Sequence, residues 1–553
     1  MEVSKTTSES DSEIDPAFPR LDASEIAAAA ALGSTMRVAA GATLFRTGDS
    51  PLDCYIVVSG AIGIFDITSP TESLLVVHGP GGFTGEVGVL AGRPALTDAR
   101  ASVDSEVVRL DAAQFRHLLA LNPLIGEKWV TALIRRRTLL LARGRGGLQV
   151  FGRADDPATL QISEFLYRNG VPHRWLDLAD DDVRARLGRL LPQGPRALPV
   201  VSLGSIPPLE GPSLDDLGRV TGVLHPIPAG RFDVVIIGAG PAGLGAAVYA
   251  ASEGLRTLVV DLLGPGGQAG SSSRIENYAG FPEGISGRDL ALRTYVQALK
   301  FGAVFAVPRS VKGLLPGAVG EHAVILSDGT TIAARAVVVS TGVSYRNFQV
   351  PGLAALAGAG VYYAATQMEA VRCRNRPVHI IGAGNSAGQA AMYLSQFTER
   401  VDLIVRGGDI YSSMSDYLAD RIVSNPKVRV RRRCELRKVG GVRLLETATI
   451  EETTSGVQSE EVSGGVFVFI GAVPATGFLG MEVARDPDGF IYTGVNVPPG
   501  AWPRTDRQPL PLETSVPGLL AAGDCRVAST KRVAFAVGDG ALAVTCLHDL
   551  FDA

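Results

Sequence analysis

The stretch FDVVIIGAGPAGLGAAVYAASEGLRTLVVD, residues 232–261, decides the fold of the largest part of this chain. An apolar strand leads into a turn that contains Gly238, Gly240 and Gly243, and a helix and a second strand then end at Asp261. The first glycine permits a tight turn, the second lets the backbone approach a pyrophosphate, and the third lets the helix lie close to the sheet. The helix N-terminus offers free amides to the phosphates, and the acid accepts a hydrogen bond from a ribose hydroxyl. The stretch therefore predicts a βαβ unit that binds a dinucleotide.

A second copy of this pattern follows in PVHIIGAGNSAGQAAMYLSQFTERVDLIVR, residues 377–406. Gly382 and Gly384 occupy the turn, and Ala387 replaces the third glycine. Two such sites in one block indicate one nucleotide held as a prosthetic group and one used as a cosubstrate. FAD with a nicotinamide is the usual pair, because a flavin accepts a hydride and passes electrons on singly or in pairs.

Three further motifs carry a resemblance to a known family: GGQAGSSSRIENYAGFP (266–282), AVVVSTGV (336–343) and LETSVPGLLAAGDCRVASTKRVAFAVGDGALA (512–543). On these motifs the block from residue 231 to 553 resembles the low-molecular-weight thioredoxin reductases over nearly its whole length. The resemblance implies a homodimer, an FAD domain at residues 230–350 and 474–553, and an NAD(P)H domain at residues 351–473. It implies FAD contacts from Gly238, Gly240, Pro241, Ala242, Gly243, Asp261, Gln268, Asn277, Val311, Thr341, Gly342, Gly523, Asp524, Arg532, Val533 and Ala534. It implies NAD(P)H contacts from Gly382, Gly384, Asn385, Ser386, Ala387 and Arg406.

The dithiol of that family is missing from this sequence. The segment GVYYAATQM, residues 360–368, aligns with the family pattern V-x-Y-C-A-T-C, so Ala364 and Gln367 stand where the two sulfurs belong. Neither side chain forms a thiolate. We expect flavin reduction to persist and the usual dithiol route onward to be absent, with the flavin carrying the chemistry and no catalytic side chain identified. Cys525 and Cys373 are alternatives, but isolated cysteines in apolar settings are mostly inert.

The choice of nicotinamide depends on residues 405–411, VRGGDIY. The family binds the 2'-phosphate of NADPH with a run of arginines, of which only Arg406 is kept, while Gly407 and Tyr411 replace two others. No carboxylate ends this strand to grip a ribose 2'-hydroxyl, as an NADH site requires. We therefore favour NADPH, with Ser412 or Ser413 assisting Arg406, and leave NADH open.

The N-terminal block, residues 20–145, alternates short strands with glycines and then reads as helix from Asp111 to Leu141, which predicts a small barrel or jelly roll. Its segment GEVGVLAGRPALTDARA, residues 85–101, resembles the phosphate-binding cassette of cyclic nucleotide-binding domains. The resemblance implies ligand contacts from Gly85, Glu86 and Val87.

The cassette departs from its family at one position. Ala95 stands where the family has the arginine that neutralises the cyclic phosphate, and a lost charge-assisted contact weakens binding strongly. Either Arg93 or Arg100 substitutes, or the ligand is not a standard cyclic nucleotide, or the barrel binds nothing.

The middle block, residues 146–225, alternates strands and helices and resembles a glutaredoxin or thioredoxin fold, with Pro199 at the place of the family's cis-proline. No cysteine occurs between Leu148 and Val223. The block therefore lacks dithiol chemistry, and we expect a structural or docking role.

Composition sets the outer limits. A chain of 553 residues favours about three or four domains, and a net charge of -4 argues against a nucleic-acid partner. Five cysteines, none in a C-x-x-C pair, favour a reduced cytoplasmic protein. We expect no signal peptide, no membrane span and no metal site. The basic run at residues 427–438 is interpreted as an exposed edge strand and not as a binding patch.

Together these features predict a multidomain α/β protein: a barrel or jelly roll with helices, a thioredoxin-like domain and two Rossmann-like domains. Three functional hypotheses remain open. The favoured one is an FAD-dependent NAD(P)H oxidoreductase with an unidentified electron acceptor, regulated through the N-terminal barrel. The alternatives are an enzyme like the ferredoxin or flavodoxin NADP reductases, and a non-catalytic sensor of flavin or nucleotide state.

Overall fold

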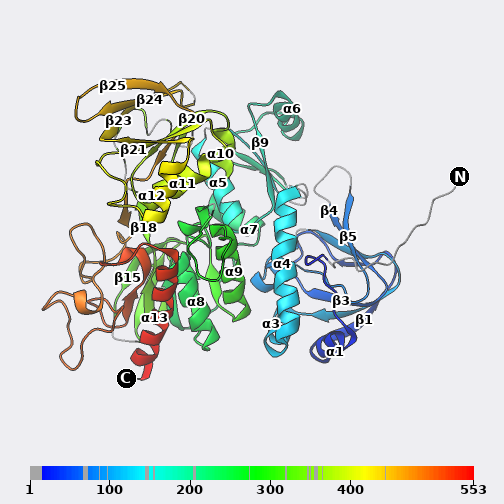
Figure 1. Ribbon diagram of the computed structural model, residues 1–553. Helices are drawn as coiled ribbons and strands as arrows, with labels where there is room; N and C mark the ends of the chain where they lie inside the picture. Colours follow the sequence, from blue (N-terminus) through cyan, green and yellow to red (C-terminus); the bar gives the residue numbers. More distant parts are fainter. Residues whose placement is uncertain are drawn as a thin grey trace. The chain divides into compact units, whose positions relative to one another are not determined.

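The computed structural model is drawn in Figure 1 and describes residues 15–66, 72–85, 87–95, 97–143, 148–153, 156–203, 207–272, 274–317, 320–345, 348, 350–353, 356, 359–363, 365, 367–442 and 444–552. The chain divides into two compact units. The first unit comprises Met1–Leu148, Gly170–Arg174 and Leu203–Pro207, and the second comprises Gln149–Asn169, Trp175–Ser202 and Pro208–Ala553.

The first unit is built from two antiparallel sheets with helices, as the sequence predicts. The sheets have the strand orders β1-β7-β3 and β2-β6-β4-β5. The strands are β1 (Ser34–Val38), β2 (Thr43–Phe45), β3 (Cys54–Ser59), β4 (Ile62–Asp66), β5 (Ser73–His78), β6 (Asp98–Ala101) and β7 (Ser105–Leu110). The helices are α1 (Ala23–Leu32), α2 (Val87–Ala91), α3 (Ala112–Leu121) and α4 (Pro123–Arg143).

The segment from Asp111 to Leu141 is helical, as the sequence predicts, and it is divided into two helices. Asp111 caps α3, with Gln114 completing a capping box, and Asn122 ends it. Pro123 then opens α4 at a first-turn position, where its missing amide proton costs nothing.

The thioredoxin-like block, β8 to α7, has the predicted alternating order. It consists of β8 (Leu148–Gly152), α5 (Pro157–Arg168), β9 (His173–Asp177), α6 (Asp181–Leu190), β10 (Val200–Ser202), β11 (Leu209–Glu210) and α7 (Leu214–Val220). The sheet order is β11-β10-β8-β9, and β10 runs antiparallel to both β8 and β11. The Leu198–Pro199 peptide is cis, as the resemblance implies.

The first dinucleotide block surrounds a seven-stranded sheet with the order β14-β13-β12-β17-β16-β15 and β28 paired to β17. Its strands are β12 (Phe232–Ile237), β13 (Thr257–Val260), β14 (Val304–Ala306), β15 (Val311–Leu315), β16 (His322–Leu326), β17 (Thr331–Val339) and β28 (Leu519–Ala521). Its helices are α8 (Pro241–Ser252), α9 (Gly287–Lys300) and α13 (Val533–Asp552), with short 3₁₀ turns η1 (Ala269–Ser271), η3 (Gly494–Asn496) and η4 (Gly523–Cys525).

Helix α13 (red in Figure 1) runs beside α8 (green). By length and composition alone α13 is apolar enough to cross a membrane. In this fold it packs closely on α8: a Cβ on Gly540 would lie 2.3 Å from the carbonyl oxygen of Ala242, and one on Gly245 would lie 3.0 Å from that of Val537. In this fold α13 is therefore a packing partner of α8.

The second dinucleotide block contains a parallel sheet with the order β19-β26-β20-β21-β22 and an antiparallel sheet with the order β23-β24-β25. Its strands are β19 (Val361–Tyr362), β20 (Pro377–Ile381), β21 (Arg400–Val405), β22 (Val428–Arg432), β23 (Cys434–Gly440), β24 (Thr447–Glu452), β25 (Gln458–Val462) and β26 (Gly465–Val468). Its helices are α10 (Gln367–Arg372), α11 (Asn385–Leu394) and α12 (Asp416–Ser424). The chain crosses between the two blocks at β18 (Val343–Tyr345) and β27 (Ala472–Pro474).

The basic run at residues 427–438 forms two strands, since Arg433 adopts a positive φ of 54° between them. β22 is the edge strand of the parallel sheet, which confirms the predicted edge position. The domain bounds 20–145, 146–225, 230–350 with 474–553, and 351–473 stay proposals.

Candidate functional site

One cavity of about 1160 Å³ lies between the glycine turns of the two dinucleotide blocks. It brings together most of the residues that the sequence nominates. From the FAD set it is lined by Gly238, Gly240, Pro241, Ala242, Asp261, Gln268, Asn277, Thr341, Gly342, Gly523, Asp524, Arg532 and Val533. From the NAD(P)H set it is lined by Gly382, Gly384, Asn385, Ser386, Ala387 and Arg406.

The glycine turn of the first block has little space for side chains at its glycine positions. Gly238 has a φ of +106°, and a Cβ there would lie 2.5 Å from the carbonyl oxygen of Ser340. Gly240 and Gly267 face each other so closely that a Cβ on Gly267 would lie 2.8 Å from the Cα of Gly240. α8 begins directly after Gly240 with no side-chain cap, so its first amides are available to an anion.

An unpaired hydroxyl marks the same wall. Among the described residues, the buried Oγ1 of Thr341 has no hydrogen-bond partner, although Thr341 lines the cavity. Buried polar atoms are rarely left unpaired unless a ligand or water meets them. The glycine cradle, the free helix terminus and this hydroxyl fit a bound FAD.

Asp261 lies at the end of the second strand and has a structural task as well. Its Oδ2 accepts from the amide of Ala239 at 2.8 Å, and its Oδ1 accepts from those of Leu263 and Gly264 at 2.9 and 2.7 Å. A carboxylate has about four acceptor positions, so one remains for a ribose hydroxyl.

The closing motif of the FAD set is held by α13. Asp539 accepts from the amide of Gly523 at 2.8 Å and pairs with Arg526 at 2.7 Å. Burial raises the pKa of Asp524, which lines the cavity, and Lys531 beside it acts in the opposite direction. Lys531 and Arg532 together give this side of the cavity two cationic side chains for the phosphates or ring of a flavin.

The second glycine turn is tied to the loop before α12. Asn385 accepts through Oδ1 from the amide and hydroxyl of Ser415 at 2.9 and 3.0 Å, so its Nδ2 and its backbone amide are the donors that it offers a ligand. Ser413 donates its hydroxyl to the carbonyl oxygen of Ala383 at 2.9 Å. Among the described residues, the exposed guanidinium of Arg406 has no hydrogen bond or ion pair, and it lines the cavity together with Ser413.

Three nominated FAD residues lie outside the cavity wall. Gly243 is a packing residue, because a Cβ there would lie 1.8 Å from the carbonyl oxygen of Gly238. Val311 belongs to β15 and packs against the core of the sheet, and Ala534 is exposed on the first turn of α13. Neither Val311 nor Ala534 is among the wall residues, and their FAD contacts stay predictions.

The sequence interpretation missed several polar residues of the wall. Lys531 lies in the motif at residues 512–543 and Arg274 in the motif at residues 266–282, so the sequence could have identified both as candidates. Asp409 and Arg437 also line the wall. Arg437 pairs with Glu435 and Glu451 at 2.9 and 2.8 Å, and nothing in its local sequence marks it for a cavity.

The position of the missing dithiol is described only in part. Ala364 lies outside the described residues, and Gln367 is described as the first residue of α10, without its side chain. Cys525 and Cys373 are fully buried, and their thiols face backbone carbonyl oxygens at 3.4 Å. Burial raises the pKa of each thiol to about 12, so neither supplies a thiolate near neutral pH.

The cassette of the N-terminal unit is also described in part. Glu86 lies outside the described residues, and Val87 is described without its side chain as the first residue of α2. Arg100 pairs with Glu72 at 2.6 Å and with Asp98 at 2.9 Å, so two carboxylates already hold it. Arg93 is buried, with 5% of its surface exposed.

Gly85, the nominated residue that opens the cassette, is anchored from α4. The buried Arg136 donates through Nη1 to the carbonyl oxygens of Phe83 at 2.9 Å and Gly85 at 3.1 Å, and through Nε to that of Ala17 at 2.8 Å. This single guanidinium therefore connects the cassette to the last helix of its unit.

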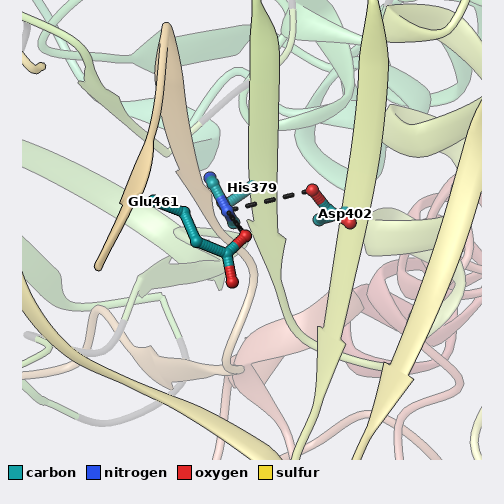
Figure 2. A group of neighbouring side chains, drawn as sticks. All are labelled: His379, Asp402 and Glu461. Atoms are coloured by element: carbon teal, nitrogen blue, oxygen red, sulfur yellow. Dashed lines mark hydrogen bonds and ion pairs between the residues drawn. The ribbon is translucent and has the colours of Figure 1, made fainter. Parts of the chain in front are cut away.

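A buried group of three titratable side chains lies in the second dinucleotide block, and Figure 2 shows His379 between Asp402 and Glu461. Nε2 of His379 lies 3.4 Å from a Glu461 oxygen and 3.9 Å from an Asp402 oxygen, and its Nδ1 lies 3.0 Å from the hydroxyl of Ser463. Their ligand-type atoms all lie within 4.8 Å of one another, which is compatible with metal spacing.

The charges around this group favour an ion-pair network over a metal centre. Asp402 accepts from Arg400 at 2.9 Å and from Arg429 at 2.5 Å, and Glu461 accepts from Arg431. Three guanidiniums surround two carboxylates, so an added cation meets net positive charge. The hydrogen bond from His379, followed by those from Ser459 and Arg431, lowers the pKa of Glu461 well below its usual range.

Comparison with known proteins identifies two matching family models and several related sequences. A family model for pyridine nucleotide-disulphide oxidoreductases matches residues 232–540, and one for cyclic nucleotide-binding domains matches residues 35–122. A thioredoxin reductase of Treponema pallidum is 34% identical over 324 residues, which cover 58% of this chain and 97% of the relative. A thioredoxin reductase of Bacillus subtilis is 33% identical over 320 residues, which cover 56% and 92%.

Solved structures show the same fold. The thioredoxin reductase of Lactococcus lactis in its FR conformation matches with 27% identity and a TM-score of 0.52, covering 58% of this chain and 99% of that one. The thioredoxin reductase of T. acidophilum matches with 27% identity and a TM-score of 0.53, with the same coverage.

Proposed function

The chain belongs to the pyridine nucleotide-disulphide oxidoreductase family, and we propose that it is a member in which electrons pass from FAD directly to an outside acceptor. The observation that carries this proposal is the pairing of a cavity fitted for two dinucleotides with Ala364 and Gln367 at the places of the two sulfurs. Bound FAD supplies hydride acceptance from NADPH and onward transfer of the electrons.

The residues of the chain have binding and orienting roles in this scheme. The amides at the start of α8 and the side chains of Lys531 and Arg532 balance the charge of the FAD phosphates. Thr341 offers its unpaired hydroxyl as an orienting contact. The second glycine turn and Arg406 receive the nicotinamide nucleotide from the opposite wall. The free thiols of all five cysteines accord with a reducing, cytoplasmic setting, which is part of the proposal.

Anaerobic reduction tests the proposed electron route. We expect NADPH to bleach the flavin of the holoprotein completely, and oxidised thioredoxin to leave the reduced flavin unchanged. A quinone, dioxygen or a small electron-transfer protein should then reoxidise it rapidly, which absorbance in a stopped-flow instrument measures. Turnover with thioredoxin would contradict the proposal that electrons bypass a dithiol. A flavin that NADPH does not reduce would favour the sensor hypothesis.

Replacing Arg406 by alanine should raise the KM for NADPH by about tenfold with little change in kcat, because a charge-assisted contact with a phosphate is lost. Steady-state kinetics with the acceptor found above measures the effect. NADH, which has no 2'-phosphate, is the internal control, and its KM should stay the same. An unchanged KM for NADPH would place the 2'-phosphate elsewhere.

A cyclic nucleotide is the proposed regulator, supported by the family match of residues 35–122. Cyclic AMP or cyclic GMP should give heat in a calorimetric titration of the holoprotein, and Arg93→Ala should weaken this binding by about tenfold or more. Arg100→Ala is the matched control, since Glu72 and Asp98 already neutralise that guanidinium. No heat with either nucleotide would remove this ligand class from the proposal.

A further inference from the structure

The thioredoxin-like block contacts the first dinucleotide block beside Asp261. Asn169, which ends α5, is buried, and its Nδ2 donates to the carbonyl oxygen of Leu263 at 2.7 Å. Leu263 and Gly264 donate their own amides to Asp261. A side chain of the thioredoxin-like block therefore holds the loop that shapes the ribose end of the FAD wall.

Two charged contacts extend this interface. The guanidinium of Arg288 on α9 lies over the ring of Tyr167 on α5, 4.2 Å from its centroid. Asp215 on α7 accepts from Arg309 at 2.9 Å, and only 12% of the Arg309 side chain is exposed. The interface therefore involves two of the three helices of the thioredoxin-like block.

The same block also reaches the second dinucleotide block. Arg372, the last residue of α10, has its guanidinium carbon 5.1 Å from the ring centroid of Trp175 on β9. On α11, the pKa of Tyr393 is raised by burial first, then by Glu369 and by the phenol of Tyr167. The contact of Arg372 with Trp175 therefore carries the link to the second dinucleotide block.

Within the described ranges, a short two-stranded ribbon and an ion pair join the two dinucleotide blocks directly. Their chain crossings, β18 and β27, pair over three residues each as an antiparallel ribbon. A two-stranded ribbon is marginally stable by itself, and blocks joined in this way move relative to each other by default. The ion pair between Arg421 and Glu276 links them at 2.5 Å, but both side chains are partly exposed, and such pairs stabilise little.

We propose that the thioredoxin-like block is an internal brace: it binds both dinucleotide blocks through α5, α7 and β9 and holds them in the orientation that forms the shared cavity. A brace needs contact surface and no redox group, which agrees with a stretch from Leu148 to Val223 without cysteine. This role does not depend on which acceptor the enzyme uses.

Hydrogen–deuterium exchange of the full-length holoprotein tests the brace. Tyr167→Ala and Arg372→Ala each remove one aromatic–cation contact, and peptides that contain β18 and β27 should exchange about threefold faster in each variant and about tenfold faster in the double variant. Exchange in β12 should stay as in the unmodified protein. Lys300→Ala is the matched control, because Lys300 lies over Phe301 within one block, 5.8 Å from its centroid.

Two outcomes would overturn the brace. The first is unchanged exchange of β18 and β27 in the double variant. The second is faster exchange in β12 as well as in β18 and β27, seen both in the alanine double variant and in the double variant Tyr167→Phe with Arg372→Lys. The latter variant keeps the aromatic ring and the positive charge. Slow exchange restored by this conservative pair supports the proposal.

Discussion

Replacing Asp402 by alanine should lower the free energy of unfolding of the second dinucleotide block by about 1.5–3 kcal/mol. The carboxylate is fully buried and accepts hydrogen bonds from Arg400 and Arg429. Without it, Arg400 loses a charged hydrogen-bond partner and Arg429 keeps only Glu461, while the space left by the buried carboxylate is not refilled. Differential scanning calorimetry of the holoprotein measures the loss.

The control for this experiment is Glu451→Ala in the neighbouring antiparallel sheet. Glu451 also pairs with an arginine, but its carboxylate is 17% exposed, whereas that of Asp402 is fully buried. Solvent screens such a pair, so its removal should change the unfolding temperature little. Equal losses in the two variants would contradict the assignment of a special role to the buried network.

Replacing Gly243 by alanine should abolish FAD retention and destabilise the first dinucleotide block by about 3 kcal/mol or more. The added Cβ would lie 1.8 Å from the carbonyl oxygen of Gly238 and 2.6 Å from the hydroxyl of Ser340. α8 has to move off the sheet to relieve this overlap, and its N-terminus then leaves the phosphate position. Flavin absorbance per mole of purified protein measures the retention.

Gly188→Ala is the matched control, because Gly188 also lies within a helix, α6, but a Cβ added there would meet no neighbouring atom within 4 Å. Alanine there should stabilise by about 0.5–1 kcal/mol, since it favours helix more than glycine does. Normal FAD content in Gly243→Ala would show that α8 tolerates displacement, as the second copy tolerates Ala387.

The two glycine turns were predictable because their residues have one steric reason to be there. Gly238 has a positive φ, and Gly240 lies against the backbone of Gly267. Both requirements select glycine, so the local sequence predicts the geometry of the turn. Asp261 was predictable for the same reason, since the acid ends a strand that the pattern already places. The thioredoxin-like block was recognisable from element order and Pro199, and the observed sheet order agrees.

The remaining features depend on register and long-range packing. Val311 was predicted to contact FAD and does not line the cavity, and a bulge between Val311 and Gly313 shifts the register of β15, which local sequence does not encode. The network of His379, Asp402 and Glu461 joins three strands, and two of its members are 82 positions apart. No short motif marks such a group, because its members come together only when the parallel and the antiparallel sheet of the block pack against each other.

The interrupted order of the first dinucleotide block determines when its site is completed during synthesis. β17 ends at Val339, and its partner β28 begins at Leu519, about 180 residues later, followed by α13, which packs on α8. At ordinary translation rates the ribosome needs about 10–40 s for this interval. The second dinucleotide block is continuous in sequence and is made within that interval. A nascent chain therefore presents a nicotinamide-type fold before it has a complete wall for flavin, and cofactor capture has to wait until β28 and α13 have been made.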